Sequence, residues 1–266
     1  MRDVSLAQVS EALRSVGVQA GDGLLAHSAL QYLGRPVGGV GLYYTALCLR
    51  LEGASPDSMP ERLSLGTLAV PTFNFSFARG LPYDPAATPS EGMGAFSEYI
   101  RQQPDAQRTP HPMQSLAVLG RYAEDLAGRD TPSAFDPGSA FERMLELDFK
   151  LLLLGADIQA VSLLHYCEQR RGVPYRYWKE FSGEIRLPSG WQRRIYRMYV
   201  RDLELDPRLE LYPVQAALQA RGQWAQAALN YGFITACRLA DFVAALDELL
   251  AADPWALVVN RPGWTK

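Results

Sequence analysis

Four short apolar runs, separated by segments of helical periodicity, constrain the fold of this chain most strongly. They span residues 24–26, 67–72, 116–119 and 150–154. Each run is long enough for a buried strand and too short for a buried helix. Because strands that alternate with helices build layered structures, the pattern predicts an α/β fold around a central sheet.

The segments between and after these runs supply the expected helices. In the first, apolar residues recur at helical spacing until Gly17, which predicts a helix over 6–16 with a glycine stop. The other predicted helices span 42–51, 94–103, 139–147, 211–220 and 239–250. Residues 183–206 instead alternate with period two around Pro188-Ser189-Gly190, which predicts a hairpin added to the main sheet.

Composition narrows the class of protein. The 266 residues are 48% hydrophobic, which suits a single domain spanning 1–266. The apolar runs are shorter than the ~18 residues of a membrane span, and the N-terminal segment lacks the apolar region of a signal peptide, so we expect a cytoplasmic protein without a membrane partner. The 26 basic and 29 acidic side chains give no field that would attract nucleic acid. The basic patch is interpreted as a solvated strand face formed by Arg193, Arg194, Arg197 and Arg201.

Cysteine and histidine spacing argues against a metal site. Cys48, Cys167 and Cys237 lie far apart without a CxxC motif, and we expect them to be buried and reduced. No two histidines have the i, i+4 spacing that places two ligands on one helical face. The chain also lacks a GxSxG nucleophile elbow and a Walker A motif.

The three histidines are the candidates for acid-base chemistry, because imidazole exchanges protons near neutral pH. His27 ends the first apolar run, His111 follows a loop in RTPHPMQS, and His165 lies in SLLHYCEQRR after the run that closes at Gly155. Ligands of open α/β sheets collect at the carboxyl ends of strands, where these residues are expected. A structural hydrogen-bonding role stays open for each of them.

Five stretches occur in an order that resembles the aminoglycoside 3-N-acetyltransferase family, the antibiotic N-acetyltransferases. They are LLAHSALQYLG (24–34), GTLAVPTF (66–73), YDPAATPSEGMGAFSEYIR (83–101), RTPHPMQSLAVLG (108–120) and LLLLGADIQAVSLLHYCE (151–168). The resemblance covers about residues 5–205, and 206–266 carry no motif that we can place. It implies an α/β/α sandwich with a mixed central sheet, distinct from the GNAT fold. It also implies acetyl-CoA as co-substrate and direct attack by a substrate amine, without an acyl-enzyme.

The resemblance assigns the general base to His165. A positioned base typically contributes ~10²–10⁴-fold to such a reaction. The carboxylate that would hold the ring is best matched by Asp202, with Glu204 as the alternative on the same strand. Glu168 completes an H-x-x-E pattern and either lines the site from the same helix face or is structural.

The same resemblance places the acyl donor. Residues implied in coenzyme A binding are His27, Ser28, Ala29, Leu30, His111 and Ser115, the last two at the thioester end. A homodimer is compatible with the sequence. One departure lies near the cofactor, where the family has a Ser-Pro pair after a glycine and this chain has Gly138-Ser139-Ala140.

A second departure concerns the acceptor. Resistance enzymes of the family carry an Asp shortly after the second apolar run, whereas this chain has PTFNFSFARG and no acid before Asp84. Asn74, Ser76 and Arg79 are then the expected acceptor contacts, which favours a less basic amine and a biosynthetic rather than a resistance enzyme. Two alternatives remain: transfer from a different acyl-CoA, and a catalytically silent relative that binds coenzyme A.

Overall fold

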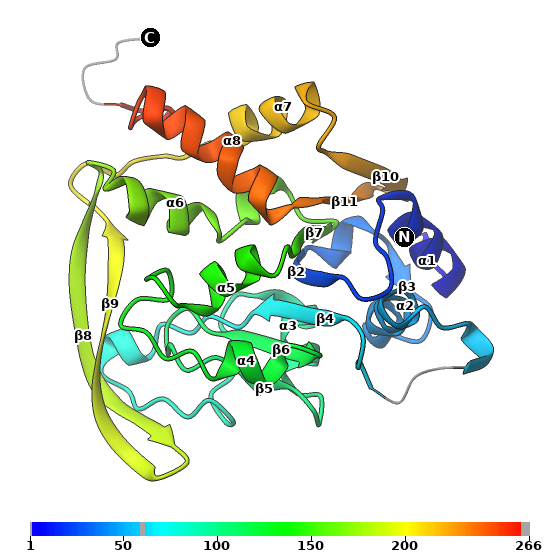
Figure 1. The fold of residues 1–266 in the computed structure, drawn as a ribbon, viewed down its shortest axis with the longest axis horizontal. Coiled ribbons are helices and arrows are strands. Elements are labelled where there is room, and N and C mark those ends of the chain that lie inside the picture. The colour runs from blue at the N-terminus through cyan, green and yellow to red at the C-terminus, as the bar shows by residue number, and fades with distance from the viewer. Residues whose placement is uncertain (1, 59–61, 262–266) are drawn as a thin grey trace.

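A mixed seven-stranded sheet forms the centre of the computed structural model, which describes residues 2–58 and 62–261 (Figure 1). The strand order is β10 (Ala225–Leu229), β11 (Gly232–Arg238), β7 (Lys150–Leu154), β2 (Gly23–Ser28), β4 (Thr67–Pro71), β6 (Leu116–Gly120) and β5 (Gln107–Arg108). The three central strands β7, β2 and β4 are parallel, and the remaining pairs are antiparallel. All four apolar runs are therefore strands, as predicted.

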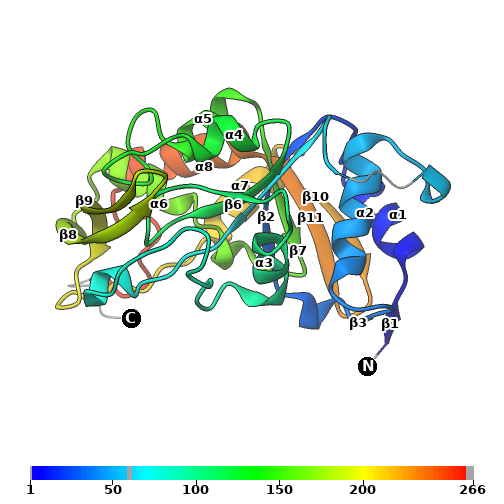
Figure 2. The same cartoon turned by 90° about the horizontal axis from the view of Figure 1, so that it is seen from below.

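Helices cover both faces of this sheet and confirm the predicted three-layer α/β/α architecture (Figure 2). Helices α1 (Leu6–Ser15), α2 (Gly41–Glu52) and α3 (Gly94–Arg101) pack on one face. The other face carries α4 (Ala123–Ala127), α5 (Ala140–Glu146), α6 (Leu164–Arg171), α7 (Tyr212–Ala220) and α8 (Leu239–Ala252). Successive strand residues point to opposite faces of the sheet. Leu24 therefore packs in the core under α1, α2 and α3, and Leu25 packs in the core on the other face.

Local sequence signals explain where the first helix begins and ends. Ser5 and Gln8 form a capping box at the start of α1, in which each side chain accepts a hydrogen bond from the other residue's backbone amide. The helix ends at Ser15, two residues before Gly17, which adopts the left-handed conformation with φ 79°. The predicted glycine stop is confirmed.

The predicted hairpin exists, but its placement in the main sheet was wrong. Strands β8 (Arg176–Leu187) and β9 (Gly190–Arg201) form a separate two-stranded sheet, a long ribbon at the left of Figure 1. One side of this ribbon buries Ile185 and Tyr196 in a small core of its own with Phe77, Tyr83 and Met113. This small core attaches one face of the ribbon to the body of the protein, whereas large apolar side chains of the ribbon outside it stay 44–60% exposed, namely Tyr177, Trp178, Trp191 and Ile195.

The edge of the main sheet is instead extended by β10 and β11, which the sequence analysis missed. Strand β10 reads AQAAL, and alanine has a low strand propensity, so the segment carries no clear strand signal. Short elements complete the chain: β1 (Asp3–Val4), β3 (Arg35–Pro36) and the 3-10 turns η1 (Leu30–Tyr32), η2 (Pro56–Ser58), η3 (Phe77–Arg79) and η4 (Ile158–Ala160).

The three cysteines are free and buried, as expected. Within the described ranges, no helix combines the length and the apolar character that a membrane crossing requires. Of the four arginines expected on a solvated strand face, Arg197 departs from the expectation, because it pairs with Asp136 at 3.1 Å and stacks over Trp178.

Candidate active site

A pocket of about 640 Å³ lies at the carboxyl ends of β2 and β4 and beside the segment that follows β7. This is the edge at which open α/β sheets bind ligands. The side chains around it come from five chain segments and include His27, Phe73, Met93, Ser162, His165 and Tyr212. Two of the three sequence-predicted histidines, far apart in the chain, are thus brought to one cavity.

His165 lies in the first turn of α6, and about a third of its side chain is exposed. Its Nδ1 lies 2.8 Å from Oε2 of Glu168, three residues further along the same helix. The i, i+3 spacing puts both side chains on one helix face. Within the described part of the chain, no group hydrogen-bonds the other ring nitrogen, Nε2, which is left for a ligand in the pocket.

Glu168 is fully buried and contacts two potential cations. Besides His165, the Nε atom of Arg176 lies 2.8 Å from the same Oε2 atom. Burial favours the neutral acid, but the hydrogen bond from His165 and the charges of His165 and Arg176 outweigh it, so the pKa of Glu168 lies below its ordinary value. The group is therefore a carboxylate at neutral pH and stabilises positive charge on the imidazole.

His27 faces the same pocket, but its Nε2 atom already takes part in hydrogen bonds. Its Nε2 accepts a hydrogen bond from the backbone N–H of Ser162 at 3.2 Å, and the Ser162 hydroxyl lies 3.1 Å from the same atom. Burial lowers the pKa of His27 to about 4. A neutral ring whose lone pair already accepts a backbone N–H is a poor base, so His27 shapes the pocket and holds Ser162.

His111 is buried elsewhere and is not among the residues that line this pocket. Its Nδ1 accepts the backbone N–H of Gln114 at 3.1 Å, and its ring meets Tyr196 edge to face at 5.2 Å. Burial lowers its pKa to about 4. The position of His111 therefore does not support the expectation that it lines the thioester end. Its ring instead joins the ribbon, through Tyr196, to the body of the protein.

The expected acidic partners Asp202 and Glu204 do not contact His165, and this expectation is corrected. The Asp202 carboxylate accepts the backbone N–H groups of Glu204 and Leu205, which places it in a turn after β9. Glu204 is exposed. The carboxylate that holds the ring is Glu168, because the helix fixes their spacing locally, whereas Asp202 is committed to its own turn.

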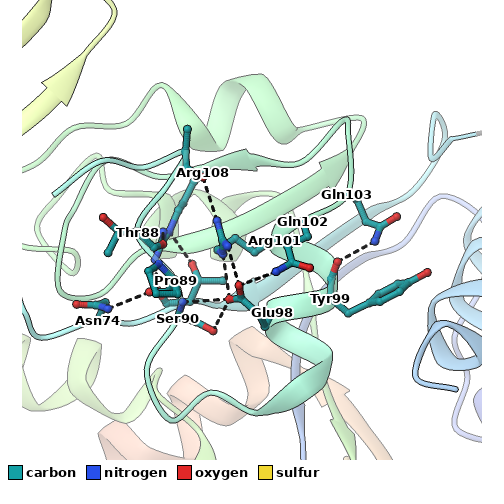
Figure 3. A network of polar contacts seen from close by, with 12 residues as sticks. Asn74, Thr88, Pro89, Ser90, Glu98, Tyr99, Arg101, Gln102, Gln103 and Arg108 are labelled. Atoms are coloured by element: carbon teal, nitrogen blue, oxygen red, sulfur yellow. Dashed lines mark hydrogen bonds and ion pairs between the residues drawn. The ribbon is translucent and has the colours of Figure 1, made fainter.

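Ser115 belongs to a buried polar network rather than to the pocket. Its hydroxyl accepts from Nε of Arg108 at 2.9 Å and donates to the Thr72 carbonyl at 3.0 Å. Arg108 also donates to the carbonyl of Thr88. Figure 3 shows this arginine reaching the loop that leads to α3. Ser115 and Arg108 thus join strand ends to that loop, which continues to Met93 in the pocket wall.

The same loop is fixed from its other side by α3. Glu98 accepts hydrogen bonds from the backbone and hydroxyl of Ser90 and pairs with Arg101, whose guanidinium also donates to the Ala86 carbonyl (Figure 3). The hydrogen bond from Arg101 is the largest reason why the pKa of Glu98 falls to about 2. This wall of the pocket is held by charged hydrogen bonds rather than by apolar packing alone.

The three residues expected to meet the acceptor make local contacts instead. Asn74 donates to the Pro89 carbonyl at 2.9 Å and accepts from the backbone and hydroxyl of Ser76. Arg79 pairs with Glu91 at 3.2 Å on the surface. None of the three lines the pocket that holds His165. Their contacts hold the loop that follows Phe73 against residues 89–91.

Strand β2 ends at Ser28, directly after His27, and the chain continues through Ala29 to Leu30. The Ala29 N–H donates to the Leu154 carbonyl at 2.9 Å, and Leu30 begins η1. Gly155 has φ 71°, and a Cβ atom there would lie 2.7 Å from the Ala29 carbonyl oxygen. The close approach of these two strand ends therefore requires glycine at 155.

Several pocket residues were missed by the sequence analysis. Ser162 stands three residues before His165 in the same motif, which was a usable signal. Glu210 and Tyr212 come from the segment without a recognised motif, so only folding brings them to the pocket. Glu210 is the one carboxylate among the lining residues, and lysine and arginine are absent from that set. The described residues also contain no group of three or more side chains suited to hold a metal ion.

The comparisons with known proteins agree with this architecture. Residues 25–251 match the family described as aminoglycoside 3-N-acetyltransferase. An aminoglycoside N(3)-acetyltransferase III of Salmonella sp is 32% identical over 179 residues, which are 64% of this chain and 62% of that protein. One of Serratia marcescens is 25% identical over 86% of both chains. The chain thus spans less than two thirds of the first of these relatives.

Solved structures of similar fold include AAC-IIIb, described as binary with CoASH, with a TM-score of 0.79 and 21% identity over 94% of this chain and 97% of that one. The apoenzyme of aminoglycoside acetyltransferase AAC(3)-IVa gives 0.77 at 25% identity, over 97% of this chain and 92% of the other. The match of the family to most of the chain, together with the sheet order and the pocket, shows that the chain belongs to the aminoglycoside 3-N-acetyltransferase family.

Proposed function

We propose that this protein transfers the acetyl group of acetyl-CoA to a primary amine of an amino sugar or aminoglycoside-like molecule, with His165 as general base. The observation that carries the proposal is the His165 ring, held through Nδ1 by the buried Glu168 carboxylate, with Nε2 left for a pocket of about 640 Å³. A base, an acid that orients it and a cavity open to the base are parts that the reaction requires.

The chemistry balances without a further reactant. The amine nitrogen attacks the thioester carbonyl carbon, and the C–S bond breaks as the amide C–N bond forms. His165 Nε2 takes the proton that the nitrogen loses, and this proton can pass to the leaving thiolate of coenzyme A. The imidazolium that forms in between is stabilised by the Glu168 carboxylate.

The charge of the site supports a cationic acceptor. The lining residues include Glu210 and no lysine or arginine, which suits an ammonium-bearing sugar rather than an anionic molecule. Family relatives are named aminoglycoside N(3)-acetyltransferases, and one similar structure is described as AAC-VIa bound to sisomicin. The absent Asp in the segment after β4 is thus offset by a carboxylate from a later segment.

For the acyl donor, the loop of Ser28, Ala29 and Leu30 is the part of the chain that we assign to coenzyme A. It leaves the sheet beside His27, at the carboxyl end of β2, which is the edge where open α/β sheets bind ligands. The similar structure described as binary with CoASH supports a coenzyme site in this fold.

The test is a thiol-release assay with acetyl-CoA and a panel of amines, followed by mass spectrometry of the product. We expect a product heavier by one acetyl group with an amino sugar. His165→Ala should lower kcat by ~10² or more, because general-base help is lost. Calorimetric Tm values should accompany the kinetics, because the buried Glu168 carboxylate loses the hydrogen bond from the ring and some stability with it. A wild-type rate in this variant would refute the role of His165, and no acetylated amine from any donor would indicate a silent relative.

A further inference from the structure

A second pocket of about 460 Å³ adjoins the one that holds His165, and its walls are aromatic. Tyr212, the first residue of α7, lines both pockets and forms part of the wall between them. We call the second pocket the aromatic cleft and define it by Tyr32, Tyr212, Trp224, Tyr231 and Phe233. We propose that the aromatic cleft binds a second, amine-bearing ring of the acceptor whose first ring is acetylated beside His165. This inference rests on the proposed function.

The aromatic side chains present free surface to the cleft. Tyr32, Tyr212, Tyr231 and Phe233 are each 47–56% exposed, although large aromatic residues usually bury most of their area in a fold. They come from η1, from α7, from the turn that joins β10 to β11 and from the start of β11. Aromatic faces bind the C–H faces of sugar rings and attract ammonium groups.

The cleft is held in shape by contacts outside it. Gly232 lets the β10–β11 turn approach η1, because a Cβ atom at 232 would lie 3.1 Å from Cβ of Tyr32. Asn230 donates from the same turn to the Leu33 carbonyl at 2.8 Å. On the outer side, Arg2 donates its backbone N–H to the Tyr231 hydroxyl and stacks over that ring. The remaining aromatic faces are thus fixed rather than collapsed onto one another.

The charge and polarity of the cleft indicate the chemistry of its occupant. Asp157 is the one charged residue among those that line it. Its Oδ1 accepts the Gln159 N–H and caps η4. Within the described part of the chain, Oδ2 has one hydrogen-bond partner, the Tyr212 hydroxyl at 3.4 Å. An ammonium group bound at Asp157 would pair with this second carboxylate oxygen.

The test compares a three-ring amine with a one-ring amine by calorimetry, which does not depend on turnover. The probes are sisomicin and 2-deoxystreptamine, and the variants are Phe233→Ala and Asp157→Asn. Asparagine keeps the cap of η4 and removes only the charge. We expect the Kd for sisomicin to rise about threefold to tenfold in each variant, as for the loss of one aromatic or ionic contact. The Kd for 2-deoxystreptamine should stay within twofold.

Matched controls lie on the ribbon. Tyr177 is as exposed as Phe233, at 47%, and Glu180 is an exposed acid, so Tyr177→Ala and Glu180→Gln should leave both affinities unchanged. Unchanged sisomicin affinity in both cleft variants would overturn the inference, as would an equal loss for the one-ring amine or no binding to the wild type. Failure of acetyl transfer with intact, cleft-dependent binding would instead count against the proposed function.

Discussion

Replacing Glu168 with glutamine tests the central contact of the site. The substitution keeps the shape of the side chain but removes the negative charge 2.8 Å from His165 Nδ1. A hydrogen bond to a charged group contributes about 1.5–3 kcal/mol, and ~1.4 kcal/mol corresponds to a factor of ten. Because the ring carries positive charge once it has taken the proton of the amine, we expect kcat to fall about 10- to 100-fold.

The same substitution should destabilise the fold through Arg176. This side chain is only 9% exposed and pairs with Glu168, so Glu168→Gln leaves a buried cation without its carboxylate. Breaking a buried pair costs about 3–5 kcal/mol. Arg176 keeps its bond to the Tyr199 carbonyl, which favours the lower end of that range. For a chain of this size, ~3 kcal/mol lowers Tm by roughly 6–12 °C.

A double variant separates the two effects. Glu168→Gln with Arg176→Met removes the unpaired cation as well, so we expect Tm to recover much of its loss while kcat stays low. The assay is steady-state thiol release at 25 °C with calorimetric Tm values for each variant. Asp202→Asn is the matched control, because this carboxylate only accepts backbone N–H groups, and kcat should stay within twofold. A folded Glu168→Gln enzyme with unchanged kcat, or an equal loss in Asp202→Asn, would refute the reasoning.

Three further predictions address the cofactor loop and the fold. Ser28→Ala should raise the KM for acetyl-CoA while kcat changes little, and an unchanged KM in steady-state kinetics would remove Ser28 from the donor site. Gly155→Ala should lower Tm by more than Gly222→Ala, because both glycines have positive φ but only at 155 would Cβ meet a carbonyl oxygen, at 2.7 Å; equal losses by calorimetry would contradict this. Glu98 has its pKa lowered to about 2 from 4.5, so its contribution to stability is complete above pH 4.5 and is lost as the pH falls toward 2. The urea midpoint of Glu98→Gln should therefore lie below that of the wild type at pH 6 and converge with it near pH 2, whereas a constant gap would exclude this linkage.

The sequence by itself determined the layers. Strands β2, β4, β6 and β7 were predicted because their short apolar runs are flanked by turn residues, and α1 because its apolar spacing stops at Gly17. These signals are local, since strand and helix periodicity depends only on neighbouring residues. Strand β10 was missed for the same reason, as its alanines carry little local preference and its pairing with β11 supplies the stability.

Only the tertiary structure decided how the site is assembled. The resemblance identified His165 and pointed to Asp202 as its acidic partner, with Glu204 as the alternative, whereas the structure pairs the ring with Glu168. That choice depends on where Arg176 and the turn after β9 come to lie. The tertiary structure also buries His111 and brings Glu210 and Tyr212 to the pocket. Periodicity records which face of an element is apolar, whereas contacts between distant segments depend on packing in three dimensions, which no local pattern encodes.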